Sequence, residues 1–301
     1  MHFTRPALIH NPVGGSANPT LKNEILSTLA RTGAFVQEYA TGPEPNSARA
    51  HAEFAIASGA DMLIAMGGDG TALEVAEAAM AANIPFAAYQ GGTSNQFASS
   101  FYPKLPPKEF CQMLVEGRVQ KIDVLELDLE LDGKKETRRA LVGVATGRIA
   151  EAISYAPRFW KRIFGPLVYF LRVLVVCFNP RPQLLRFRSE DREWSSRVST
   201  AAIFNVDRTP VVRLAPACNA SDGLLDLVEV KARNIFEMLV TGFWLLVGRN
   251  YRAEQFAHRR LEELYFESDE PISLNVDGEP ATADRVRVCV LKGALSMIVS
   301  H

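Results

Sequence analysis

The first third of the chain alternates short apolar runs with segments in which apolar residues recur every three or four positions. The short runs predict buried strands, and the longer periodic segments predict helices. The expected strands cover 6–10, 34–39, 62–66 and 84–89, and the expected helices cover 19–29, 47–57 and 72–80. Alternation of strand and helix is typical of a parallel sheet with helices on both faces, so we predict a doubly wound α/β domain here.

The pattern changes around residues 103–120. Residues 123–131 alternate strictly, with leucines on one face and acidic side chains on the other, and Asp132-Gly133 then predicts a hairpin turn before a returning strand at 139–145. Further short strands are expected at 183–188, 197–206, 211–214, 224–230, 265–268, 272–276, 285–290 and 295–300. This half is predicted to be an antiparallel β-sandwich or flattened barrel with helical insertions near 148–178 and 232–256. We therefore expect an α/β domain over 1–122 and an all-β domain over 123–301, with the last segment packing back on the first domain as an alternative.

Composition excludes several classes of protein. The 301 residues are 48% hydrophobic and 22% charged, which is typical of a globular chain with a sizeable core. The formal net charge of -1 argues against a nucleic-acid-binding protein that neutralises many phosphates. The four cysteines are scattered without a C-x-x-C pair, which favours reduced thiols over a zinc site or a disulfide framework.

Two apolar stretches raise the question of a membrane. Residues 164–178 are interrupted by Arg172, and residues 235–248 contain Glu237. Both are shorter than the ~20 apolar residues that span a bilayer. They predict buried helices or, as the alternative, attachment to a membrane surface. Because the N-terminus lacks the apolar region of a signal peptide, we expect a cytoplasmic protein, with the inner face of a membrane as a second location.

The third expected strand runs straight into Gly67-Gly68-Asp69-Gly70-Thr71 and then a helix. Glycines at this position let the backbone approach a ligand closely, and the free N–H groups of the helix's first turn favour phosphate. Asp69 is placed to hold a magnesium ion or to receive a proton. A tight strand-to-helix turn capped by Asp and Thr is the alternative interpretation.

Two more glycine-bearing loops follow strands of the same predicted sheet, at residues 11–16 and 90–95. Ligands of open α/β sheets bind beyond the carboxyl ends of the strands, so the three loops are expected to converge at one edge. Neither G-x-x-x-x-G-K-[ST] nor a G-x-G-x-x-G after the first strand is present.

Five motifs follow one another along the chain: Asn11-Pro12-x-Gly14-Gly15, Gly67-Gly68-Asp69-Gly70-Thr71, Gly92-Thr93-x-Asn95, the segment Asn219 to Asp226, and Asp277-Gly278-Glu279. Together they resemble the motifs of the diacylglycerol kinase catalytic family, which includes bacterial lipid kinases, eukaryotic diacylglycerol kinases, and sphingosine and ceramide kinases. The resemblance covers nearly the whole chain. It implies an NAD-kinase-like nucleotide-binding domain followed by a β-sandwich, with the acceptor site between them, and an enzyme that uses ATP to phosphorylate a lipid hydroxyl. Such transfer requires aligned oxygens, charge neutralisation by Mg²⁺ and a proton acceptor.

The resemblance also implies roles for individual residues. Glu279 would be the proton acceptor, with Asp277 as a second carboxylate and Asp69 among the catalytic groups. The ATP site would consist of Asn11, Thr41, Gly67, Gly68, Asp69, Gly70, Thr71, Ala72, Leu73 and Thr93. Asp222 would bind a structural Mg²⁺ with the backbone carbonyls of Asn219 and Leu224, and Asp123 would stand near the catalytic metal.

Simpler interpretations remain for each of these segments. Asp277-Gly278-Glu279 is also a plain hairpin turn, Asp222-Gly223 a turn before a strand, and Thr41 a helix cap. His10 and His51 have no partner pattern and are interpreted as structural or solvated. Two positions depart from the family pattern: Gln96 replaces an aspartate of the third loop, and Val13 replaces a small or polar residue of the first.

Three functions follow as hypotheses. The first is a membrane-surface lipid kinase whose acceptor is a diacylglycerol, phosphatidylglycerol, ceramide or sphingoid base. The second is a kinase of a soluble acceptor such as NAD, which shares the glycine turn but not the late acidic segments. The third is a non-catalytic lipid-binding member, suggested by Gln96. An exposed edge strand of the second domain would allow two chains to pair as a homodimer.

Overall fold

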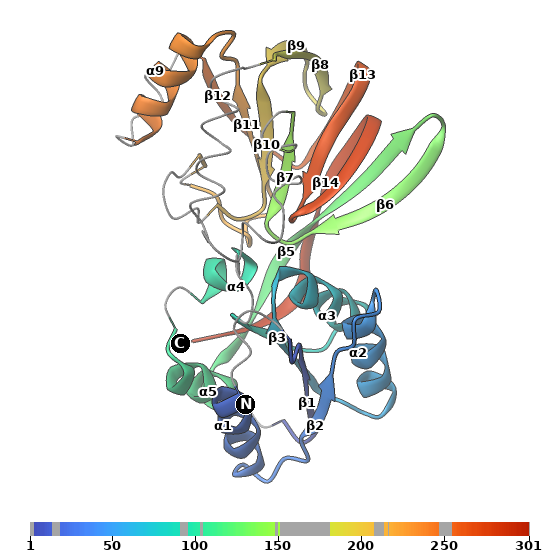
Figure 1. Cartoon of the computed structure of the whole chain (residues 1–301), viewed down its shortest axis with the longest axis vertical. Helices are drawn as coiled ribbons and strands as arrows, with labels where there is room; N and C mark the ends of the chain where they lie inside the picture. Colours follow the sequence, from blue (N-terminus) through green and yellow to red (C-terminus); the bar gives the residue numbers. More distant parts are fainter. Residues whose placement is uncertain are drawn as a thin grey trace. The chain divides into compact units, whose positions relative to one another are not determined.

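The computed structural model describes residues 3–13, 19–90, 96–102, 105–147, 150, 181–207, 214–215, 217–246 and 255–300. The chain forms two compact units (Figure 1). The first unit comprises Met1–Ile122 with Gly293–His301, and the second comprises Asp123–Lys292. The predicted α/β and all-β halves are both present. The strand expected at 211–214 and the insertion near 148–178 lie almost entirely outside the described residues.

The first unit is built on a parallel sheet in the order β2-β1-β3-β4, and the last part of β14 extends it beyond β4. Its elements in chain order are β1 (Pro6–His10), α1 (Pro19–Ala30), β2 (Gln37–Ala40), α2 (Ser47–Ala57), β3 (Met62–Gly67), α3 (Asp69–Ala82), β4 (Phe86–Gln90), α4 (Gln96–Phe101) and α5 (Pro107–Glu116). Helices α2 and α3 pack together, and α1 packs with α5 (Figure 1). All six residues of β3 are buried, which explains its uninterrupted apolar sequence.

The C-terminal segment completes this sheet. Met297 of β14 pairs in parallel with Phe86 of β4. The hydroxyl of Tyr102, which is 196 residues away in sequence, donates a hydrogen bond of 2.6 Å to the carbonyl of Ile298. Burial raises the pKa of Tyr102 far above its ordinary value, so this hydroxyl stays protonated and donates. The end of β14, from Gly293 onward, therefore belongs structurally to the first unit.

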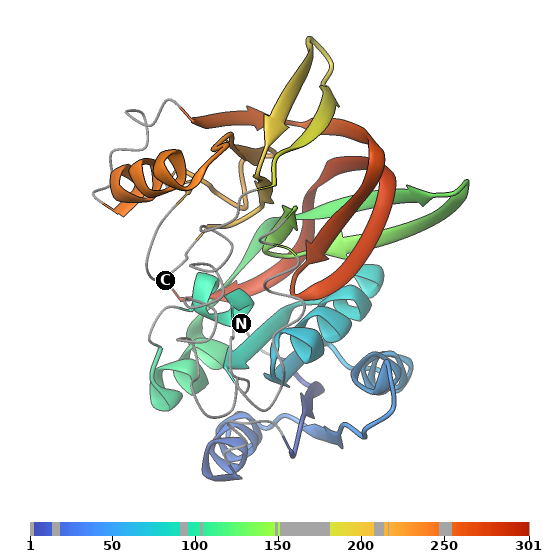
Figure 2. The same ribbon diagram turned by 45° about the horizontal axis from the view of Figure 1, so that its top comes forward.

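The second unit is antiparallel, in the strand order β12-β11-β10-β7-β13-β14, with β5–β6 attached at β14 and β8–β9 at β13. Its elements are β5 (Arg118–Leu131, which begins in the first unit), β6 (Lys134–Ala140), β7 (Gly143–Thr146), β8 (Gln183–Arg188), β9 (Glu193–Val198), β10 (Thr200–Phe204), β11 (Leu225–Val230), α9 (Ile235–Leu246), β12 (Phe256–Leu261), β13 (Glu263–Val276) and β14 (Glu279–Val299). Figure 2 shows how β13 and β14 curve together through the sandwich. Leu125, Leu127 and Leu129 point into its core, as their alternation predicts.

One strand prediction in this unit was wrong in its limits, and one strand was missed. The strand expected at 139–145 is interrupted at residues 141–142, because the N–H groups there donate to the carboxylate of Asp277. Strand β12 was not predicted, since the consecutive His258, Arg259 and Arg260 at its centre leave no apolar run.

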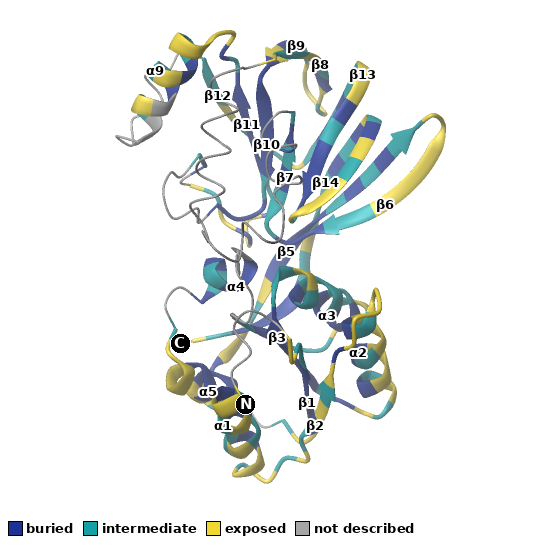
Figure 3. Ribbon diagram, viewed as in Figure 1, coloured by how far each residue is buried: buried dark blue, intermediate teal, exposed yellow. Residues whose placement is uncertain are grey.

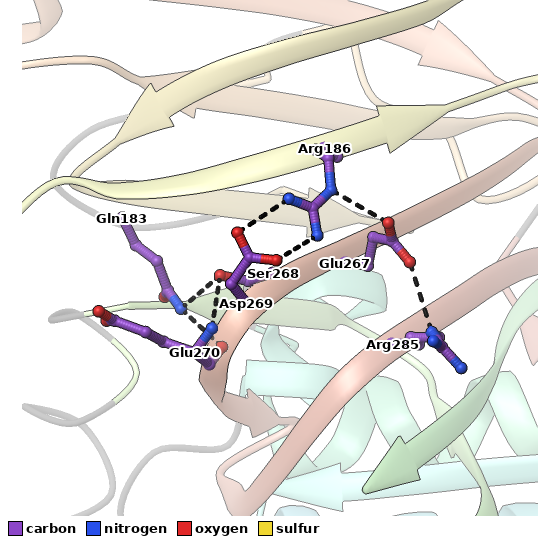
Figure 4. Close-up of polar contacts among 7 residues, drawn as sticks. All are labelled: Gln183, Arg186, Glu267, Ser268, Asp269, Glu270 and Arg285. Carbon is purple, nitrogen blue, oxygen red and sulfur yellow. Dashed lines mark hydrogen bonds and ion pairs between the residues drawn. The ribbon is translucent and has the colours of Figure 1, made fainter. Parts of the chain in front are cut away.

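Strand β13 is one strand where two were predicted. Its register against β14 shifts between Glu267 and Ile272, where Pro271 cannot donate a ladder hydrogen bond. Side chains hold this irregular segment (Figure 4). Arg186 of β8 binds Asp269 through two bonds of 2.8 and 3.0 Å and Glu267 through one of 3.0 Å. Arg285 approaches the other side of Glu267. The hydrogen bonds from Arg186 hold the pKa of the exposed Asp269 carboxyl below its ordinary value.

Candidate functional site

The glycine turn between β3 and α3 is built mainly from backbone. Gly68 is the N-cap of α3 in an extended conformation, and being glycine it offers no side-chain oxygen to the N–H groups of the first turn. A Cβ on Gly67 would lie 2.7 Å from the Thr71 side chain, whereas a Cβ on Gly70 would meet nothing within 4 Å. Gly67 is therefore required for local fit, and Gly70 leaves open space above the helix N-terminus. This arrangement suits an anion.

Asp69 has a hydrogen-bonding role that the sequence did not reveal. Its Oδ1 accepts a hydrogen bond of 3.0 Å from the backbone N–H of Phe97, at the start of α4. The carboxylate thus connects the glycine turn to the helix that follows the third glycine-bearing loop. Thr93 and Asn95 of that loop lie outside the described residues, as does the side chain of Gln96.

Two other predicted ATP-site residues lie at the same edge of the sheet as this turn. Asn11 follows β1 and donates its backbone N–H to the carbonyl of Met66 in β3, at 2.9 Å. Thr41 follows β2 and donates its N–H to the carbonyl of His10, also at 2.9 Å. Asn11, Thr41 and the glycine turn therefore lie at the carboxyl ends of three adjacent parallel strands, and their part in binding ATP stays a prediction. The loop with Gly14 and Gly15 is outside the described residues.

His10 has a partner that sequence reasoning missed. Its Nε2 lies 3.0 Å from Oε1 of Glu38, and Lys22 donates to the same oxygen at 2.6 Å. Burial lowers the pKa of His10, and the hydrogen bond from Lys22 lowers that of Glu38. Only the pairing of β1 with β2 brings these residues together, so no local pattern could have revealed the contact. His51 stacks on Tyr39 with ring centroids 5.6 Å apart.

The second unit contains two of the predicted metal ligands in one cluster. Asp123 is buried, its N–H donates to the carbonyl of Ala220, and its Oδ2 accepts a 2.8 Å bond from the N–H of Gly223. Asp222 is exposed, forms an ion pair with Arg260, and accepts a 3.0 Å bond from the N–H of Leu224.

These contacts test whether the segment fits a structural Mg²⁺. Both oxygens of Asp222 already accept hydrogen bonds, one from a guanidinium and one from a backbone amide. No group of three acidic, histidine or cysteine side chains suited to a metal occurs among the described residues. These contacts give both Asp222 oxygens a partner, and the roles of Asp222, Asn219, Leu224 and Asp123 in metal binding stay predictions.

The acidic turn between β13 and β14 is a two-residue hairpin. Asp277 and Gly278 both have positive φ, at 46° and 98°, as a type I′ turn requires. The Asp277 carboxylate accepts hydrogen bonds from the backbone N–H groups of residues 141, 142 and 143, at 2.6 to 3.1 Å. Glu279 is the first residue of β14 and is exposed. Asp277 therefore positions the turn, and Glu279 presents a carboxylate to solvent.

The cysteines and the two apolar stretches are the remaining features that the sequence singled out. Cys111, Cys218 and Cys289 are free thiols, and burial raises the pKa of each. Cys177 and the stretch 164–178 lie outside the described residues. Among the helices that are described, none is both long and apolar enough to cross a bilayer.

Comparison with known proteins gives consistent results over both halves of the chain. Residues 5–127 match the diacylglycerol kinase catalytic domain, and residues 144–299 match the YegS C-terminal NAD kinase beta sandwich-like domain. The chain is 27% identical to "Probable lipid kinase YegS-like" of Xanthomonas oryzae over 293 residues, covering 94% of this chain and 93% of that protein. The protein of the same name from Pseudomonas aeruginosa is 29% identical over 261 residues, covering 84% and 81%.

A solved structure shows the same fold. A diacylglycerol kinase from Bacillus anthracis superposes with a TM-score of 0.73 at 18% identity, covering 100% of this chain and 98% of that one. The shared fold agrees with the two domain matches, which together cover nearly the whole chain. The chain therefore belongs to the family whose members combine a diacylglycerol kinase catalytic domain with a YegS C-terminal domain.

Proposed function

We propose that this protein transfers the γ-phosphoryl group of ATP, used as its Mg²⁺ complex, to a hydroxyl of a membrane lipid. The observation that carries the proposal is the turn from β3 into α3. There, a glycine N-cap without a side-chain oxygen and the open space at Gly70 lie at the carboxyl end of a parallel strand, where the first turn of a helix favours phosphate. The family and the relatives' names support a kinase acting on a lipid.

Each group has a chemical task in this proposal. The first-turn N–H groups of α3 hold phosphate oxygens, and Asn11 and Thr41 line the same edge. The acceptor oxygen attacks the γ-phosphorus, the bond to the bridging oxygen of ADP breaks, and the hydroxyl proton passes to the carboxylate of Glu279. Asp277 keeps the hairpin in place through its three backbone bonds. The Asp69 carboxylate would hold the Mg²⁺ that accompanies ATP and so neutralise phosphate charge, and it orders the start of α4.

The acceptor class is a glycerolipid or sphingolipid hydroxyl, and the panel that tests it follows from that class. Labelled ATP with Mg²⁺ is incubated with mixed micelles of diacylglycerol, monoacylglycerol, phosphatidylglycerol, ceramide or sphingosine, and with NAD as a soluble acceptor. The proposal expects one labelled lipid and unlabelled NAD. Omitting Mg²⁺ should abolish the label.

Asp69→Asn provides the matched control for this assay. The amide oxygen still accepts the bond from the Phe97 N–H, so the fold is kept while the negative charge is removed. We expect the label to fall by about a hundredfold or more, in line with removal of one preorganised electrostatic group. Labelled NAD would contradict the lipid acceptor. Absence of any label with ATP binding intact would instead favour the non-catalytic alternative.

A further inference from the structure

Among the described residues, helix α9 packs on the second unit along one face. Met238 packs with Val228 and Val230 of β11 and with Ala232, and Thr241 is buried beside it. Figures 1 and 2 show the helix, in orange, at the outer side of this unit next to β11 and β12. These inner side chains account for the described packing of α9 on the sheet. They do not explain the character of its outer face.

The outer face of α9 is apolar, which is unusual for a helix that faces water. Ile235, Phe236, Leu239 and Phe243 are exposed and recur at helical spacing, so they form one stripe, termed the α9 stripe (Figure 3). Four of the nine exposed large hydrophobic side chains in the described part of the chain belong to this one helix. The other five are isolated on separate elements, as is normal for a protein surface.

The polar groups around the helix leave this stripe uninterrupted. Glu237 is the single charged residue within α9, and its carboxylate turns back to accept bonds from the Arg233 N–H and the Asn234 side chain. Asn234 in turn accepts a bond of 2.9 Å from the Glu237 N–H, so the pair closes a capping box. The acidic group is therefore used at the helix start. Arg233 is left exposed immediately before the apolar stripe.

We propose that the α9 stripe inserts into the surface of an anionic lipid bilayer, with Arg233 facing the headgroups. An amphipathic helix of twelve residues with phenylalanines outward and a basic residue at its end suits the interface between headgroups and acyl chains. The ring centroids of Phe243 and Trp244 lie 5.3 Å apart, so the stripe includes one member of an aromatic pair. The inference rests on the proposed function, because a bilayer is where the lipid acceptor is found.

A second copy of this chain is the competing occupant. A helix of this length presents a strip roughly 18 Å by 10 Å. Such a strip is small beside the ~800 Å² that each partner buries in a stable protein interface. A bilayer needs no such area, because each inserted apolar side chain contributes separately.

The test is sedimentation of the full chain with vesicles of equimolar phosphatidylcholine and phosphatidylglycerol, without ATP. The double variant Phe236→Ser with Phe243→Ser removes two rings that are 73% and 57% exposed. Its matched control is Phe35→Ser with Phe54→Ser, which removes two rings that are 67% and 62% exposed in the first unit. We expect vesicle affinity to fall at least about tenfold in the first variant and to stay unchanged in the control.

The charge is tested separately. Arg233→Gln should weaken binding about fivefold on these vesicles and leave binding to pure phosphatidylcholine unchanged. Raising the salt concentration should remove the difference between wild type and this variant. Equal loss in the Phe35/Phe54 control, or no loss in the α9 variant, would overturn the proposal. So would a change of oligomeric state in the α9 variant with vesicle affinity retained, because it would identify a second copy as the occupant.

A dispersed short-chain diacylglycerol, assayed without vesicles, distinguishes this inference from the proposed function. The α9 variant should phosphorylate the dispersed acceptor at the wild-type rate and lose activity only on vesicle-borne lipid. If the wild type binds vesicles through α9 but phosphorylates no lipid, the proposed function fails while the docking surface stands. If the wild type phosphorylates dispersed lipid but never binds vesicles, the docking surface fails alone.

Discussion

The two turns that carry the candidate chemistry are built in opposite ways. At the turn from β3 into α3, the backbone is the functional part: glycines remove side chains so that N–H groups face outward. At the hairpin from β13 to β14, the backbone is held in a left-handed conformation so that side chains can act. The anion binding proposed for the first unit depends on the absence of side chains, whereas the proton acceptor proposed for the second, Glu279, follows a turn that the Asp277 carboxylate holds in position.

The largest effect should come from Glu279→Gln. The amide keeps the size of the side chain but cannot accept a proton, so kcat should fall about a thousandfold while KM for ATP changes little. Because Glu279 is exposed, the free energy of unfolding should not change, and urea titration provides that control. A variant with normal kcat would show that the hairpin is only a turn.

Asp277→Asn should instead act on stability. Asparagine tolerates positive φ, so the substitution isolates the charge that accepts three backbone N–H bonds. We expect a loss of about 3 kcal/mol in the free energy of unfolding, measured by urea denaturation. If kcat falls a thousandfold while stability is unchanged, Asp277 is catalytic and the division of labour at this hairpin is wrong.

The glycine turn can be examined with a matched pair of alanine substitutions. Gly67→Ala places a methyl group 2.7 Å from Thr71 and should lower the free energy of unfolding by about 2 kcal/mol. Gly70→Ala meets nothing within 4 Å and should be neutral or stabilising, yet raise KM for ATP about tenfold by occupying the space meant for phosphate. Unchanged nucleotide binding in Gly70→Ala would place the phosphates elsewhere.

The smallest effect concerns His10, which adjoins the glycine-turn edge. Burial lowers its pKa below the ordinary 6.5, so the unfolded chain binds the proton first as pH falls. Stability should therefore decrease as the pH falls below about 6.5. The Glu38 contribution disappears only at lower pH, because its pKa is lowered from 4.5. His10→Gln should flatten the pH dependence of Tm in this window.

Features that depend on local sequence patterns, such as these turns, could be predicted from the sequence. The buried strand, its glycine turn and the leucine alternation of β5 are local patterns, and the structure confirms all three. The Asp-Gly dipeptides at 132–133 and 277–278 both form hairpins for the same local reason. What remained hidden depends on pairs distant in sequence: Asp69 with Phe97, His10 with Glu38, and Asp277 with residues 141–143.

The predicted limits of strands were wrong where polar contacts to side chains replace the backbone hydrogen bonds between strands. The break at 141–142 exists because a carboxylate more than a hundred residues later accepts those N–H groups, which no window over 139–145 contains. The exposed side of α9 is a different case. The sequence indicated an apolar segment, but only the fold tells which residues are used by the sheet and which are left outside.

The return of β14 to the first unit has a consequence for biosynthesis. During synthesis, residues 6–90 are made long before the segment that pairs with β4. The hydrogen bond between Tyr102 and Ile298 likewise joins residues that are 196 positions apart in the sequence. The sheet of the first unit therefore keeps an open edge beside Phe86 until the segment around Met297 has been synthesised. Chains that stop before residue 293 should be recognised by chaperones at this edge, even though every residue of the glycine turn has already been synthesised.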